Sequence, residues 1–166
     1  MRQLKNKNMK YLFTIFFSFF ILFSLNGQEI TDQMKGKWII KRFQSAGPSG
    51  MSNQMAEFYI GDTVSFDNFI RQSFEENEFT RAAGLSPIKC EFRPGKKIKI
   101  EDPIKYFSDK FEIKPIVLGI KEPSEVYLIK VNCKDDFFKE IHFDVNNDKI
   151  FLFTLGMFFI LDRLEK

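Results

Sequence analysis

Hydrophobic and polar residues alternate along much of the chain beyond residue 36, as in β-strands that bury one face. The alternation is clear where Val64 and Phe66 lie between polar neighbours. Near the C-terminus, four strand-like stretches follow one another with links of two to four residues, at 126–133, 137–144, 149–154 and 157–164. Because a parallel partner needs a crossover of about a dozen residues, these four strands should form an antiparallel meander.

The first half of the chain predicts further strands. Residues 36–43 are rich in β-forming side chains and predict the first strand, and residues 69–74 predict another. Apolar side chains also alternate over residues 88–92 and again over residues 97–101. The Pro94-Gly95 pair lies between these two stretches, so the pattern predicts a hairpin.

Two short helices interrupt the predicted strands. Ser52 can cap a helix that runs to Tyr59 and places Met55, Ala56 and Tyr59 on its buried face. Asp102 precedes Pro103, the combination that begins many helices. In this second helix, over residues 102–111, spacings of three and four predict a buried face made by Ile104, Phe107 and Phe111.

Together these elements predict a mainly β fold. We expect an antiparallel up-and-down barrel or strongly curled sheet of about eight strands, with one or two short helices. Closure of the sheet would remove the exposed edges that promote aggregation. No internal repeat and no linker rich in Gly, Ser or Pro divides residues 29–166, which we interpret as one domain.

Residues 1–28 have the layout of a secretory signal peptide, with a basic start and an uncharged stretch at residues 11–25. A retained membrane anchor is the alternative, but fifteen helical residues span only about 22 Å of a roughly 30 Å hydrocarbon core. Removal of the leader changes the formal charge from +3 to −1, so we expect no nucleic-acid partner. The prediction is an exported protein, periplasmic or secreted, without a stable membrane anchor after cleavage.

The two cysteines, Cys90 and Cys133, gain a possible role from export because an oxidising compartment allows a disulfide. Such a bond would stabilise the fold by about 4 kcal/mol on a chain-entropy estimate. If Phe92 and Val131 face inward, both cysteines do so as well. Two buried free thiols are the alternative. We expect no metal site, because the chain has no C-x-x-C motif and one His.

The Gly36-Lys37-Trp38 motif on the first strand and Arg163 on the last resemble the lipocalin-like (calycin) family of small exported barrels. The resemblance implies that Trp38 closes one end of a barrel and that Arg163 packs over it, with Gly36 as the third structural residue. A guanidinium over an indole ring contributes roughly 0.5 to 2 kcal/mol. The resemblance differs in that a helix at 102–111 interrupts the strands and no long helix follows the barrel.

Candidate chemistry is sparse. His142, the only histidine, lies two residues from both Glu140 and Asp144, and this trio is predicted to form a solvated strand face rather than a catalytic or metal site. Residues 47–50 lack the pattern of a nucleophile elbow or a phosphate loop and are predicted to form a mobile loop. Basic residues near Pro94 could attract an anionic surface or merely guard an edge: Arg93, Lys96, Lys97 and Lys99.

We therefore expect a binding module without catalytic residues, cofactor or metal. Its candidate ligand is a small hydrophobic molecule, held by inward aromatic side chains that could equally be core: Trp38, Phe66, Phe92, Tyr127 and Phe143. The alternative is a protein-interaction or inhibitor domain with a filled barrel, which would present loops to an exported protein partner. The sequence does not separate these two functions.

Overall fold

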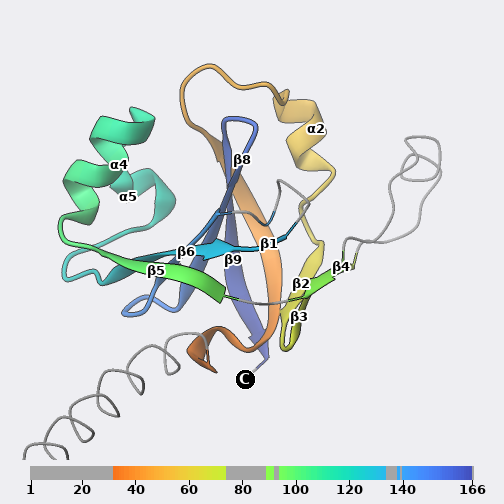
Figure 1. Ribbon diagram of the computed structural model, residues 1–166. Coiled ribbons are helices and arrows are strands. Elements are labelled where there is room, and N and C mark those ends of the chain that lie inside the picture. The colour runs from red at the N-terminus through yellow and green to blue at the C-terminus, as the bar shows by residue number, and fades with distance from the viewer. Residues whose placement is uncertain (1–31, 74–88, 92–93, 134–137, 139, 166) are drawn as a thin grey trace, which may run out of the picture. The chain divides into compact units, whose positions relative to one another are not determined.

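Figure 1 shows the computed structural model, which describes residues 32–73, 89–91, 94–133, 138 and 140–165. The chain divides into two units, Met1–Gln33 and Met34–Lys166, and the fold below is that of the second. The leader, residues 1–28, lies outside the described residues, so the signal peptide stays a prediction. Within the described ranges, no helix is both long and apolar enough to cross a membrane.

The described strands form one antiparallel sheet with the order β4-β3-β2-β1-β9-β8-β7-β6-β5. Every strand pairs with its neighbour in the chain except at β4 and β5, and β1 pairs with β9. This up-and-down sheet curls into half a barrel, which confirms the predicted mainly β fold class (Figure 1). The strands are β1 (Gly36–Ser45), β2 (Thr63–Phe66), β3 (Phe69–Ser73), β4 (Lys89–Glu91), β5 (Pro94–Ile100), β6 (Val126–Val131), β7 (Glu140–Asp144), β8 (Lys149–Thr154) and β9 (Met157–Glu165).

The predicted hairpin around Pro94-Gly95 is wrong. β4 pairs with β3, whereas β5 pairs with β6, so these two strands are the opposite edges of the described sheet. Pro94 and Gly95 lie inside β5, where a register irregularity follows Pro94. A proline is tolerated at the first residue of an edge strand, because its missing N–H is not needed there. Glu91 and Pro94 are at most about 11 Å apart along the chain, so the two edges approach each other at this end.

Short helices lie between the strands, and their caps follow the sequence. Ser52 accepts a hydrogen bond from Met55 N at the start of α2 (Asn53–Glu57), and Asp102 accepts one from Lys105 N at the start of α4 (Pro103–Phe111). Both helices were predicted. A third helix, α5 (Pro115–Leu118), was not, because four residues are too few to display a helical period.

Two apolar residues that were assigned to buried helix faces are exposed instead. Met55 on α2 and Ile104 on α4 are 52% and 39% exposed, whereas Ala56, Phe107 and Phe111 are buried as predicted. Both exposed side chains lie in the first turn of a short helix. Periodicity shows which residues share a helix face, but not how far the neighbouring surface extends along that face.

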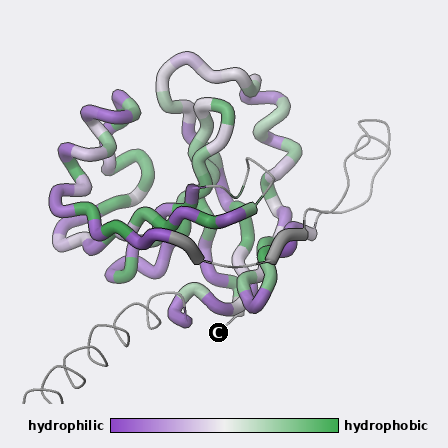
Figure 2. Tube along the Cα trace, in the orientation of Figure 1, coloured by the Kyte–Doolittle hydropathy of each residue, from purple (hydrophilic) through white to green (hydrophobic). Residues whose placement is uncertain are grey.

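The sheet buries side chains on both faces of its second half. We call the face that carries Trp38, Phe143 and Ile150 the inner face. The opposite, outer face carries Leu128, His142, Phe151, Phe158 and Ile160, and α4 and α5 cover it (Figure 1). Hydrophobic and hydrophilic positions are mixed along α4, as expected for a helix with one side packed on a sheet (Figure 2).

Candidate functional site: the groove beside helix α4

A groove of about 530 Å³ lies between α4 and the outer face of β5 and β6. Its apolar lining comes from Ile98 and Ile100 on β5, Leu128 on β6 and the ring of Tyr106 on α4. Charged side chains of both signs surround this lining: Lys99, Glu101, Asp102, Lys105, Asp109 and Lys110. The local structure follows from the sequence, because alternation in β5 turns Ile98 and Ile100 toward the helix.

A chain of polar contacts leads from the groove into the core. Lys110 Nζ donates to Tyr106 Oη at 3.0 Å, and Tyr106 Oη lies 3.1 Å from Nε2 of His142. At the surface, Lys110 and Lys130 lie 3.7 Å and 3.5 Å from the carboxylate oxygens of Glu140. Tyr106 is half-buried. Its hydroxyl therefore connects the solvated Lys110–Glu140 ion pair to the fully buried imidazole of His142.

The imidazole of His142 is surrounded by aromatic rings. Its centroid lies 5.3 Å from that of Phe107, 5.9 Å from that of Phe111 and 5.9 Å from that of Phe158. Burial, followed by repulsion from the Lys110 ammonium, lowers the pKa of His142 from 6.5 to about 3, although a hydrogen bond with the Phe151 backbone opposes this shift. The ring is therefore neutral at physiological pH and accepts the Tyr106 hydroxyl proton at Nε2.

The prediction that Glu140, His142 and Asp144 form a solvated face is wrong. His142 and Asp144 are fully buried, and Glu140 is half-buried. The physical reason is the excursion of residues 101–125 between β5 and β6, which folds α4 and α5 over this face. Asp144 has a structural role, because its carboxylate accepts hydrogen bonds from Ser124 Oγ and Asn147 Nδ2.

The predicted ligand-lining aromatic residues divide into three groups. Trp38, Phe66 and Phe143 are at most 1% exposed, and the Trp38 and Phe143 rings make an edge contact at 6.1 Å. Tyr127 is half-buried, and its hydroxyl donates to Glu125 Oε1 at 2.6 Å. Phe92 lies outside the described residues. The three covered rings therefore offer no surface to a ligand in this conformation.

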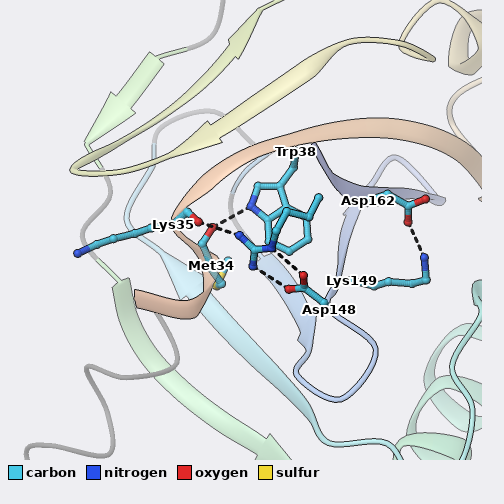
Figure 3. Close-up of polar contacts among 7 residues, drawn as sticks. Met34, Lys35, Trp38, Asp148, Lys149 and Asp162 are labelled. Atoms are coloured by element: carbon cyan, nitrogen blue, oxygen red, sulfur yellow. Dashed lines mark hydrogen bonds and ion pairs between the residues drawn. The ribbon is translucent and has the colours of Figure 1, made fainter. Parts of the chain in front are cut away.

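The end of the sheet where β1 begins holds Trp38 and Arg163 together. Arg163 Cζ lies 4.1 Å from the centroid of the Trp38 ring. Figure 3 shows the surroundings: Trp38 Nε1 donates to Met34 O at 2.8 Å, and Asp148 lies close by. Arg163 donates through Nε and Nη2 to the two carboxylate oxygens of Asp148, and through Nη1 to Lys35 O. Gly36, the first residue of the motif, has a φ of 123°.

The backbone gives the positions of the two cysteines in the sheet. Cys90 lies in β4 opposite Ile70, and its side chain lies outside what the structure describes. Cys133, which is 8% exposed, follows β6 by two residues. Val131 pairs with Pro94, the residue three positions after Glu91, so β6 leads toward the end of β4. The disulfide between Cys90 and Cys133 stays a prediction.

The loop after β1 is fastened to the turn between β8 and β9, contrary to the mobile loop predicted from its Gly and Pro content. Gly50 N and Ser49 Oγ both donate to Leu155 O. A Cβ on Gly156, whose φ is 78°, would lie 2.8 Å from Ser49 Cα. Only glycine therefore allows this close approach of two backbones.

The predicted basic cluster does not form at a hairpin tip. Lys96, Lys97 and Lys99 lie along β5, and Lys99 Nζ donates to Glu125 Oε1 at 2.8 Å, whereas Arg93 lies outside the described residues. The Lys99–Glu125 contact raises the pKa of Lys99 and lowers that of Glu125.

Sequence reasoning missed the groove and the buried imidazole. The available signal was the run of consecutive apolar residues in β8 and β9, Ile150–Phe153 and Phe158–Leu161. Strands that are apolar on both faces are covered on both sides. That signal predicts a cover on the outer face, although it does not identify α4 as the cover.

No family model matches this chain, and neither a curated protein nor a solved structure matches it. Among the described residues, no group of three or more His, Cys, Asp or Glu side chains is arranged to hold a metal ion.

Proposed function

We propose that this chain is an exported, lipocalin-like binding module that holds a small hydrophobic ligand in the groove between α4 and strands β5 and β6. The observation that carries the proposal is the groove of about 530 Å³ with Ile98, Ile100 and Leu128 in its lining. Its volume lies within the range of about 300–1,000 Å³ that is usual for small-molecule sites. Burial of an apolar ligand on these side chains would release water from them.

The proposed ligand site differs from the interior site expected from the aromatic pattern. Trp38, Phe66 and Phe143 are all buried, and the Trp38 and Phe143 rings contact each other, so a ligand among them would have to displace packed rings. Displacement of packed side chains is costly because protein interiors have few voids. The groove needs no such rearrangement, and this favours the outer face as the ligand site.

Three features support a lipocalin-like exported barrel. The sheet runs up and down and joins its first and last strands, and Arg163 stacks over Trp38 at the start of β1. Residues 1–28 carry the pattern of a signal peptide, which supports export of the domain at residues 29–166.

Two arguments support a disulfide between Cys90 and Cys133. An exported protein meets an oxidising compartment, and β6 leads Cys133 toward the end of β4, the strand that contains Cys90. We expect the mass of the denatured, unreduced protein to stay unchanged after alkylation. Two added labels without reductant would contradict the bond.

The ligand proposal is tested with the neutral fluorescent probe N-phenyl-1-naphthylamine and the purified mature chain. We expect saturable binding, at least tenfold weaker binding to Ile98→Glu, and unchanged binding to the control variant Ile116→Glu. Ile116 is 61% exposed and does not line the groove, so this control adds the same charge elsewhere. Absence of saturable binding to the wild-type chain would contradict the proposal.

The single tryptophan distinguishes the two possible ligand positions. Trp38 is the only Trp in the chain and lies on the inner face. A brominated alkane, used as a competing ligand, quenches indole fluorescence only at contact range. If it binds in the groove, it should displace the fluorescent probe but leave the emission of Trp38 unchanged. Quenching of Trp38 in parallel with displacement would place the ligand in the interior instead.

A protein-interaction domain is the second candidate function, and exposed apolar side chains favour it. Met55, Phe58 and Ile60 on α2 and the turn after it are 40–52% exposed. If this surface contacts an exported protein, Met55→Asp should abolish capture of that partner, and Ile98→Glu should not. Loss of capture with Ile98→Glu alone would assign the partner to the groove.

A further inference from the structure

His142 is the most unusual group in the described part of the chain. It is a titratable side chain, fully buried in an aromatic cluster, and its Nε2 lies 3.1 Å from Tyr106 Oη. The Phe151 backbone favours the charged form of the ring, but burial outweighs this contribution. A buried charge without an opposite charge beside it is costly, so the imidazole is neutral in this position.

Helix α4 is the element that covers this histidine and can leave it without breaking the sheet. Residues 101–125 form an excursion between β5 and β6, and these two strands pair directly with each other from Lys97–Ile129 to Ile100–Val126. The sheet register is therefore complete without α4. Two aromatic residues of α4, Phe107 and Phe111, pack on the outer face, and Tyr106 supplies the polar contact to His142.

We propose that α4 is an acid-released clamp: it closes over the neutral imidazole of His142, and protonation of that imidazole favours its opening and exposes the apolar outer face. The proposal is independent of whether the groove holds a ligand. It does, however, predict that acid changes the groove, because Tyr106 and Lys110 also line it.

Of the groups that face His142, the backbone of Phe151 favours a positive charge on the ring, and the others oppose that charge or leave it uncompensated. From α4, Tyr106 contacts Nε2 and Lys110 contributes an ammonium. On β7 itself, Asp144 is hydrogen-bonded to Ser124 and Asn147, and Glu140 lies near Lys110 and Lys130 of β6. From β8, the Phe151 backbone forms a hydrogen bond that favours the charged ring, whereas the side chains of Phe151 and of Phe158 on β9 are apolar. No carboxylate contact to the imidazole is present among these residues.

Opening should therefore take up a proton. In the closed clamp the pKa of His142 is about 3, whereas a solvated histidine has its ordinary value of 6.5. Between these two pH values the closed form binds no proton at His142 and the open form binds one. The opening equilibrium constant should then rise roughly tenfold for each pH unit of acidification.

Amide hydrogen exchange of the full mature chain, followed by mass spectrometry from pH 6.5 to pH 4, tests the clamp. After correction for intrinsic exchange rates, protection of α4 amides should fall roughly tenfold per pH unit. In His142→Phe, which preserves an aromatic ring but cannot be protonated, the pH dependence of α4 protection should vanish. Tyr106→Phe is the matched control, because it removes the hydrogen bond but leaves the buried imidazole, so the pH dependence should persist.

Three results would overturn the proposal: α4 protection that does not depend on pH, an unchanged pH dependence in His142→Phe, or α4 amides that exchange only together with those of β9. The last result would mean that exchange needs global unfolding. If His142→Phe does not fold, the ring resonances of the wild-type protein give the answer. His142 is the only histidine, and a normal titration near pH 6.5 without loss of α4 protection would equally contradict the clamp.

Discussion

Arg163 shows how one side chain fixes the end of the sheet. Its planar guanidinium stacks on Trp38 and also donates to both carboxylate oxygens of Asp148 and to Lys35 O. These contacts join β9, the turn before β8 and the residue that precedes β1. Lysine offers a point charge without this rigid, planar set of donors, so it cannot replace all of them together.

We therefore expect Arg163→Lys to lower the free energy of unfolding by about 2 kcal/mol, as charge-assisted hydrogen bonds are lost in a mostly buried site. The measurement is the midpoint of urea denaturation at neutral pH. Arg71→Lys is the matched control, because Arg71 and Asp67 form an exposed ion pair that should contribute less than about 1 kcal/mol. Equal losses in both variants would contradict this role of Arg163.

The predictability of single residues depended on whether their partners are visible in the sequence. Trp38 and Arg163 were marked by a motif and by their places on the first and last strands. The burial of His142 depends on a helix that begins 39 residues before it, at Pro103. Whether a side chain on a strand is exposed depends on which helix or loop packs on that face of the sheet. Alternation within the strand carries no information about such a distant element.

Helix α4 begins and ends with well-defined caps. Asp102 caps its start, and its C-cap residue, Glu112, adopts a left-handed conformation with a φ of 53°. A side chain in this region of backbone space costs roughly 1–2 kcal/mol, whereas glycine adopts it freely. Glu112 is exposed and has no described contact that glycine would remove.

Glu112→Gly should therefore stabilise the protein, by about 1 kcal/mol in thermal or urea unfolding. Glycine near the middle of the helix, in Ser108→Gly, should instead destabilise the protein by about 0.5 kcal/mol, because glycine weakens a helix interior. Opposite signs are the expected result. Destabilisation by both substitutions would mean that the left-handed residue is not strained.

At the level of elements, local signals were sufficient for strands and caps but not for pairing. The Ser52 and Asp102 caps, the alternation in β2 and the β-forming stretches of β6–β9 gave correct elements. The Pro94-Gly95 pair resembled a turn, yet it lies within β5. Turn residues indicate where a chain can bend, whereas strand pairing is set by burial across the whole sheet.

For the whole domain, two buried titratable groups act in opposite directions on stability. Burial raises the pKa of Asp62 from 3.8 to about 6, although a hydrogen bond from Gln72 opposes this shift. Asp62 therefore stabilises the fold at low pH, and this contribution is lost as the pH rises through 6. Burial lowers the pKa of His142 to about 3, so its effect is reversed: stability is complete above pH 6.5 and is lost as the pH falls toward 3.

Between pH 4 and pH 6, unfolding should take up one proton at His142 and release one at Asp62, so these two groups leave the wild-type stability nearly independent of pH. Asp62→Asn removes the compensation, and stability should then fall by about 1.4 kcal/mol per pH unit of acidification relative to wild type. His142→Phe should show the opposite trend and gain stability over wild type as the pH falls. Urea unfolding at pH 4, 5 and 6 measures both differences. Every other carboxylate is common to the three proteins, so the comparison isolates Asp62 and His142. If both variants showed pH profiles parallel to that of the wild type, the burial of both groups would be contradicted. If only one variant did so, the group that it replaces would be the one that remains solvated.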